Sequence, residues 1–177
     1  MIMSKIIQKL TGGDLRSIGK AEEVVEDILR NPSLFTEVFD GMLYDDPRVR
    51  MRSADVLEKV TKIHPEFLQP FKNRLINEIS EIQQQEVRWH VAQMFSYLVL
   101  TKSDMKNIIT ILFSYIDSSN SNIVKVFSLQ TLADIAMKDP SFKPKVIEKL
   151  KQMVNSGSPA IVNRCNKLIN KLERLNY

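Results

Sequence analysis

The only cysteine of this 177-residue chain, Cys165, and its only two histidines, His64 and His90, are the first candidates for nucleophilic or metal chemistry. A nucleophilic thiol needs a neighbouring base or cation that lowers its pKa, and a metal site needs several ligands at defined spacing. The sequence contains no C-x-x-C, no H-E-x-x-H and no acidic cluster at metal-ligand spacing. We therefore expect no metal and no cofactor. We expect Cys165 to lie in the core and His64, directly before Pro65, to be a local structural residue.

Phosphate-binding chemistry has no support in the sequence either. The only adjacent glycines, Gly12 and Gly13, are not preceded by the strand that a phosphate-binding loop requires. The nucleophile elbow of hydrolases and the dinucleotide-binding glycine motif are also absent. These absences predict a protein that is not an enzyme.

The composition is that of a globular protein, with 44% hydrophobic residues, 26% charged residues and a net charge of +4. No apolar run approaches the roughly 20 residues of a membrane-spanning helix, so we expect no membrane partner. The first ten residues have Lys5 inside their apolar stretch and no cleavage site after it, so we expect no secretory signal. A single cysteine fits a reducing compartment, and a cytoplasmic location is the prediction.

The elements that would position functional side chains repeat along the chain. The segment DPRVRMRSADVLEKV, starting at Asp46, aligns with segments starting at Gln84, Ser121 and Ser158, at steps of 38, 37 and 37 residues. Apolar residues recur in it at i, i+4, i+7, i+8 and i+11, which predicts an amphipathic helix, here called a B helix. Asp46, Ser121 and Ser158 can cap these helices, whereas Gln84 is the weakest cap.

A second repeating segment precedes each B helix and predicts an A helix. These segments begin near Pro32, Pro65, Ser103 and Pro140. The repeat is therefore a hairpin of two helices whose aligned apolar columns should be buried. The predicted core positions of the B helices are Val49, Leu57, Val60, Val87, Phe95, Leu98, Val124, Leu132, Ile135, Ile161, Ile169 and Leu172.

A shorter first repeat is predicted at the N-terminus. Its A helix covers residues 4–10 and is closed by Gly12 and Gly13, and its B helix follows Asp14. No run is typical of a strand. The fold class is therefore predicted as all-α, in one domain of five hairpins at approximately 1–31, 32–63, 64–101, 102–138 and 139–177.

The B-helix starts resemble those of HEAT repeats, close relatives of armadillo repeats. The motif D-P-x-V-R is complete at residues 46–50 and is partly kept as EVR at 86–88, IVK at 123–125 and AIV at 160–162. The resemblance implies a right-handed α-α superhelix with the B helices along a concave face. It also implies that the basic column of Arg50, Arg88 and Lys125 is structural and pairs with acidic groups in the turns.

The free sector of the B helices, opposite the core columns, is the predicted binding surface. Its centre is aromatic, apolar and amide-bearing, with Trp89, His90, Gln93, Tyr97, Phe127 and Gln130. Its flanks are basic, with Arg52, Lys59, Arg164 and Lys171. Met51 falls in the same sector. The alternative is that these side chains pack against one another and close the groove.

Two functions fit this surface. The first is a protein-binding scaffold that holds a peptide or helix of a partner protein, with aromatic anchors and basic rims that favour an acidic partner. The second is nucleic-acid binding, because HEAT-like solenoids also occur among DNA alkylation-repair glycosylases. Asp55 or Asp134 would then be the candidate catalytic carboxylate. The chain is short, no motif of that family aligns convincingly and the net charge of +4 is weak, so no catalytic residue is assigned and the first function is the prediction.

Overall fold

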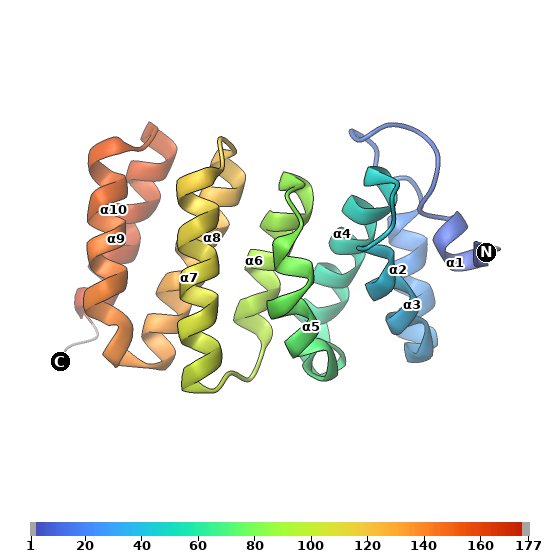
Figure 1. Cartoon of the computed structure of the whole chain (residues 1–177), viewed down its shortest axis with the longest axis horizontal. Helices are drawn as coiled ribbons and strands as arrows, with labels where there is room; N and C mark the ends of the chain where they lie inside the picture. Colours follow the sequence, from blue (N-terminus) through green and yellow to red (C-terminus); the bar gives the residue numbers. More distant parts are fainter. Residues whose placement is uncertain (1–2, 175–177) are drawn as a thin grey trace. The chain divides into compact units, whose positions relative to one another are not determined.

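The computed structural model describes residues 3–174, which contain ten α-helices, five short 3-10 helices and no strand (Figure 1). This confirms the all-α prediction for the described part of the chain. The α-helices are α1 Lys5–Gln8, α2 Ala21–Arg30, α3 Phe35–Gly41, α4 Pro47–Ile63, α5 Lys72–Asn77, α6 Gln85–Tyr97, α7 Lys102–Ser118, α8 Asn122–Lys138, α9 Lys143–Ser156 and α10 Pro159–Arg174. The 3-10 helices are η1 Pro32–Leu34, η2 Pro65–Phe67, η3 Gln69–Phe71, η4 Ile79–Glu81 and η5 Pro140–Phe142.

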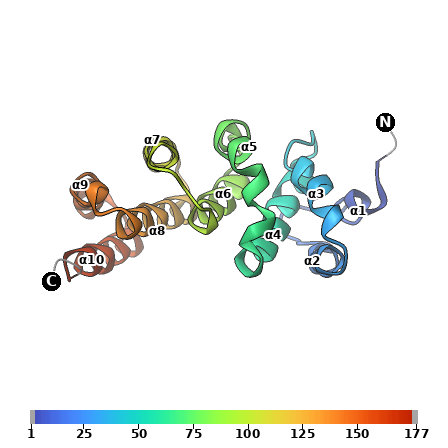
Figure 2. The same cartoon turned by 90° about the horizontal axis from the view of Figure 1, so that it is seen from below.

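The helices divide between two compact units, Met1–Val99 and Leu100–Tyr177. The first unit contains α1 to α6 and the second contains α7 to α10. Odd-numbered helices fall at the positions predicted for A helices and even-numbered helices at those predicted for B helices. In Figure 2, α7 and α9 of the second unit lie on one side and α8 and α10 lie on the other.

Side-chain caps fix the starts of several B helices. The Asp46 carboxylate accepts a hydrogen bond from the Arg48 backbone N–H at 2.9 Å, and the Ser121 hydroxyl accepts one from Val124 at 3.4 Å. Gln84 makes no side-chain cap, as its weak capping chemistry predicts. The cap predicted at Ser158 is not formed, because its buried hydroxyl has no hydrogen-bond partner among residues 3–174.

The column of basic residues at the starts of the B helices has a structural role. Arg50 donates to the carbonyl oxygen of Tyr44 at 2.7 Å and to the side-chain oxygen of Gln84 at 2.8 Å. Arg88 donates to the carbonyl oxygen of Ile82 at 3.0 Å. The contacts fit the structural interpretation for Arg50 and Arg88, whereas the Lys125 side chain forms no hydrogen bond or ion pair within residues 3–174. For Arg50 the partners are carbonyl and amide oxygens of the turns and not the predicted acidic group.

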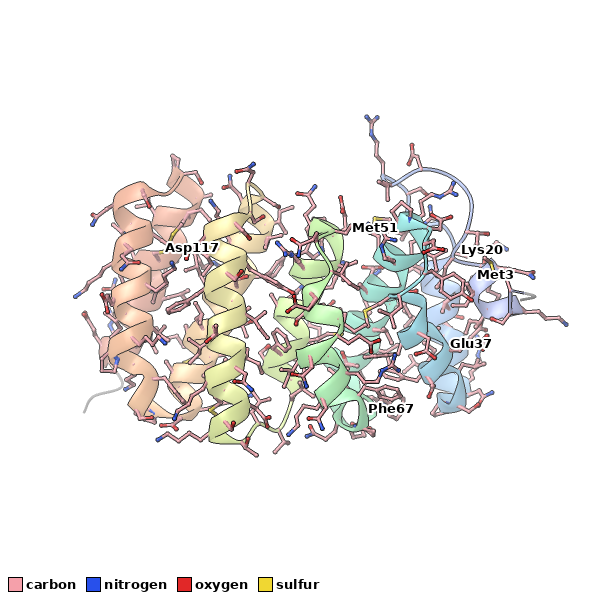
Figure 3. All side chains as sticks on the ribbon, viewed as in Figure 1. Met3, Lys20, Glu37, Met51, Phe67 and Asp117 are labelled. Carbon is pink, nitrogen blue, oxygen red and sulfur yellow. The ribbon has the colours of Figure 1, made fainter. Side chains whose placement is uncertain are left out.

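The core of the first unit forms around α4, which packs against α2, α3 and α6. All six core positions predicted on α4 and around α6 are buried: Val49, Leu57, Val60, Val87, Phe95 and Leu98. Side chains fill the spaces between the ribbons (Figure 3). Met51, labelled in Figure 3, is also buried, so its predicted place in the free sector is wrong.

The core of the second unit forms around α8, which packs against α7, α9 and α10. Of the predicted positions Val124, Leu132, Ile135, Ile161 and Leu172 are buried, whereas Ile169 is only half-buried. Cys165 lies fully inside this core, as predicted, and burial raises the pKa of its thiol to about 11. The thiol is therefore protonated and unreactive at neutral pH.

The first hairpin differs most from its prediction. Helix α1 ends at Gln8 and α2 begins only at Ala21, so residues 9–20 form a loop, here called the N-terminal loop. Gly12, Gly13 and Gly19 have positive φ angles, which a right-handed helix does not accept.

None of the helices described is long and apolar enough to pass through a bilayer.

Candidate interaction surface

Arg52 is a structural residue and not the rim cation that the sequence predicts. Its side chain is 1% exposed, and its guanidinium donates hydrogen bonds of 2.7–3.0 Å to five backbone carbonyl oxygens. The acceptors all lie in or next to the N-terminal loop: Leu10, Thr11, Gly12, Asp14 and Ser17. The prediction fails because this loop folds back over α4 and covers the sector that a helical wheel leaves free.

Glycines allow the N-terminal loop to approach the Arg52 guanidinium closely. Gly19 has φ +56°, and a Cβ atom there would lie 3.1 Å from the guanidinium carbon. Arg48 adds a further hydrogen bond, from its guanidinium to the carbonyl oxygen of Gly13 at 3.0 Å. The loop is thus fixed from α4, while Leu15 and Ile18 remain exposed on its outer side.

Lys59, the second basic residue predicted on this flank, is engaged by two carboxylates. Its ammonium lies 2.5 Å from Glu22 on α2 and 2.9 Å from Asp55 one turn earlier on α4. Burial opposes the charged form, but the hydrogen bonds to both carboxylates outweigh it and raise the pKa of Lys59. The basic flank of the first unit therefore serves internal contacts.

His90 is buried against α4 and is not a surface contact residue. It is 9% exposed, its Nε2 lies 3.9 Å from an Asp55 oxygen, and its Nδ1 has no partner among the described residues. Burial, together with the positive charge of Lys59, lowers the pKa of His90 to about 4. The negative charge of Asp55 opposes this shift. The imidazole is therefore neutral near pH 7.

The other predicted contact residues of α6 are half-buried. The Gln93 amide donates to the Trp89 carbonyl oxygen at 3.3 Å, within the same helix. The Tyr97 hydroxyl donates to the nearly buried carboxylate of Glu58 on α4 at 2.5 Å. The structure brings these residues to one side of α6, but part of each side chain is used inside the unit. His90 and Tyr97 contact α4, so packing inside the unit takes up part of this predicted surface.

The B helices of the second unit keep a more open face. On α8, Phe127 and Gln130 are half-buried, and the Gln130 amide bridges two neighbours. It donates to Asp134 at 2.9 Å and accepts from the Arg164 guanidinium of α10 at 3.1 Å. Ile123, one turn before Phe127, is 49% exposed. Sequence reasoning missed it, although its i, i+4 spacing from Phe127 was a usable signal.

Four cations form an exposed row along α10, here called the basic row: Arg164, Lys167, Lys171 and Arg174. Their spacing of i, i+3, i+7 and i+10 places them on one side of the helix. None of the four forms an ion pair within residues 3–174. The predicted basic flank is therefore present and unneutralised in this unit.

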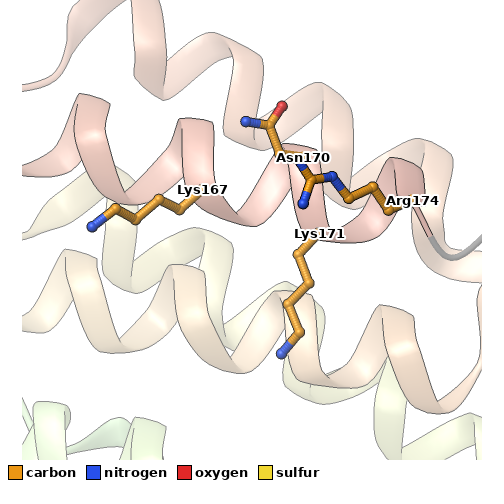
Figure 4. A pocket seen from close by; sticks show the side chains of 4 residues that line it. All are labelled: Lys167, Asn170, Lys171 and Arg174. Carbon is orange, nitrogen blue, oxygen red and sulfur yellow. The ribbon is translucent and has the colours of Figure 1, made fainter.

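Two shallow depressions lie along the basic row. One, of about 380 Å³, is lined by Lys167, Asn170, Lys171 and Arg174 (Figure 4). The other, of about 370 Å³, lies between α8 and α10 and is lined by Val126, Ala160, Asn163, Arg164 and Lys167. The apolar side of α8 and the basic row of α10 thus border one depression. Together they form the α8/α10 face, made of Ile123, Val126, Phe127, Gln130 and the basic row.

The lysines of α9 contrast with the basic row. Lys149 is buried and lies 2.6 Å from the Asp117 carboxylate, and Lys145 lies over the Phe113 ring at 5.4 Å.

Positive charge is concentrated at the C-terminal end of the sequence. Residues 140–177 contain eight Lys and Arg but only two Glu, a net charge of +6, whereas residues 1–139 contain 17 Lys and Arg against 19 Asp and Glu, a net charge of −2. A count of charge by repeat would have revealed this concentration, which the net charge of +4 conceals.

No group of three or more His, Cys, Asp or Glu side chains in the part of the chain that the structure describes could hold a metal ion. Comparisons of the chain with protein-family models, with curated proteins and with solved structures give no match. What the protein binds must therefore be inferred from the exposure and charge of its own side chains.

Proposed function

We propose that this protein is a non-enzymatic, HEAT-like helical solenoid that binds a partner protein on the free face of its B helices. One observation carries the proposal: the α8/α10 face places exposed, unneutralised cations beside half-exposed apolar side chains. Protein interfaces combine an apolar centre with a polar rim in this way. The positive charge favours an acidic partner.

Nucleic acid is the alternative occupant of a basic surface, and the apolar strip argues against it. Phosphates are bound by Lys, Arg and backbone amides, and they gain nothing from Ile123 or Val126. An acidic protein segment uses both halves of the face. The HEAT-like superhelix would align successive B helices and so extend this surface.

The test starts from proteins that co-purify with the chain, with and without nuclease treatment. A bound protein is then titrated against the wild type, against Phe127→Ala and against Thr110→Ala, an exposed position on the A helix α7 used as a control. Loss of a central anchor costs about 2 kcal/mol, so Phe127→Ala should weaken binding about 30-fold while the control leaves it unchanged. Recovery of nucleic acid alone, or full affinity of Phe127→Ala, would refute the proposal.

A further inference from the structure

We propose that the occupant of the α8/α10 face is a short, acidic, amphipathic α-helix of the partner. This inference rests on the proposed function and specifies the chemistry and conformation of the bound segment. It is carried by three features of the second unit: the spacing of the basic row, the apolar strip beside it, and the lack of internal carboxylates for its charges.

The spacing of the basic row matches that of a second helix. An α-helix rises 1.5 Å per residue, so the row from Arg164 to Arg174 spans about 15 Å, in steps of about 4.5 to 6 Å. Asp or Glu residues at i, i+3, i+7 and i+10 of a partner helix repeat the same intervals. In an extended segment, side chains on one side follow at about 6.6 Å. Such a segment falls out of register along the row.

The apolar strip supplies the second half of the recognition. Ile123 and Phe127 lie one turn apart on α8, and Val126 lines the depression next to Arg164 and Lys167. Helices that bind in grooves insert apolar side chains at i, i+3 or i+4, and i+7. An amphipathic helix would set its apolar stripe on α8 and its acidic stripe on α10. This arrangement desolvates the apolar strip without burying an unpaired charge.

The basic row of α10 differs from the two basic residues predicted on the flank of the first unit. On α4, Arg52 is bound internally by carbonyl oxygens and Lys59 by Glu22 and Asp55. The four cations of α10 have no carboxylate partner within residues 3–174, and Arg164 donates to the neutral amide oxygen of Gln130. They keep one side of α10 positive over a length of only about 15 Å. A short acidic segment fits this length, and a long polyanion gains few contacts from it.

The experiment uses a synthetic fluorescent peptide as the probe. The peptide carries Glu at i, i+3, i+7 and i+10 and Leu on the adjacent stripe, and a side-chain staple holds it helical. A second peptide has the same composition in scrambled order. Fluorescence anisotropy measures the affinity of each peptide for the full chain. The acidic helix should bind at least tenfold more tightly than the scrambled peptide.

Variants of the chain test the location of the contact. The double variant Lys167→Glu/Lys171→Glu should lose at least tenfold in affinity. Lys151→Glu, on the exposed side of α9, changes charge in the same sense and should lose less than threefold. A peptide with Lys in place of Glu should bind the double variant better than the wild type. All three substituted positions are exposed, and circular dichroism verifies that the variants remain helical.

Three outcomes would overturn the inference. Equal binding of the scrambled peptide would mean general charge attraction, and equal loss in Lys151→Glu would place the contact elsewhere. Tighter binding of a 12-base-pair DNA duplex, with a steep dependence on salt, would assign the face to nucleic acid. If the acidic helix fails while a co-purified protein still depends on Phe127, the inference falls and the proposed function stands.

Discussion

The substitution Arg52→Lys keeps a positive charge on α4 but removes the planar guanidinium that holds the N-terminal loop. The guanidinium donates to five carbonyl oxygens from three nitrogen atoms, Nε, Nη1 and Nη2. A lysine ammonium has three donors on one nitrogen and cannot occupy these three positions at once. At least two carbonyl oxygens therefore lose their donor.

The expected loss follows from these contacts. A hydrogen bond to a charged group contributes about 1.5 to 3 kcal/mol, and part of the loss is recovered because carbonyls of an exposed loop can bind water. We expect Arg52→Lys to lower the free energy of unfolding of the first unit by about 2 to 4 kcal/mol. Arg52→Ala also leaves a cavity and should cost about 3 to 5 kcal/mol.

The assay uses urea unfolding followed by the fluorescence of Trp89, the only tryptophan, which lies in the first unit. Hydrogen exchange of residues 9–20 reports the loop directly and should accelerate in both variants. Arg30→Lys is the matched control, because Arg30 is exposed and within residues 3–174 its side chain pairs only with Glu26 on the same helix. A loss below about 1 kcal/mol, or unchanged exchange in the loop, would refute the role assigned to Arg52.

Further predictions concern both units. The pKa of His90 falls from 6.5 unfolded to about 4 folded, so the unfolded chain binds the extra proton. The contribution of His90 to stability should be full above pH 6.5 and should decline by about 3 kcal/mol between pH 6.5 and 4. His90→Gln should flatten this decline in urea titrations at each pH, and His64→Gln, at a half-exposed site, should not. Leu132→Ala, in the core of the second unit, should lower the unfolding free energy by about 2 to 5 kcal/mol, measured by circular dichroism; a loss under about 1 kcal/mol would contradict its assigned position. Tyr97→Phe removes the donor to the nearly buried Glu58 and should cost about 1 to 3 kcal/mol by Trp89 fluorescence, and an unchanged midpoint would argue against this bond.

The fold was largely predictable because its information is local and periodic. The apolar columns at 37- and 38-residue steps located the B helices, and eleven of the twelve predicted core positions are buried, Ile169 being the exception. Ile169 is half-buried although α10 packs against α8 and α9. A helical wheel gives the sector that a residue occupies and not how completely neighbouring elements cover it.

The candidate surface was predictable only in part, because a wheel shows which sector a helix leaves free and not what covers that sector. Arg52 was assigned to the rim, and the distant N-terminal loop covers it. His90 was assigned to the groove, and it faces Asp55 across the helix pair. On α10 no described residue covers the sector, and Arg164 and Lys171 are exposed as predicted.

The burial of Cys165 gives the second unit a built-in reporter of its own opening. Thiol reagents react with the thiolate, and a pKa of about 11 together with complete burial prevents reaction in the closed state. Because the chain has no other cysteine, the rate of thiol labelling reports only the opening events in which α10 leaves the core. The same helix carries the basic row on its outer side. A ligand that binds the basic row of the folded protein stabilises the closed state. It should therefore slow the labelling of Cys165, although it does not contact that residue.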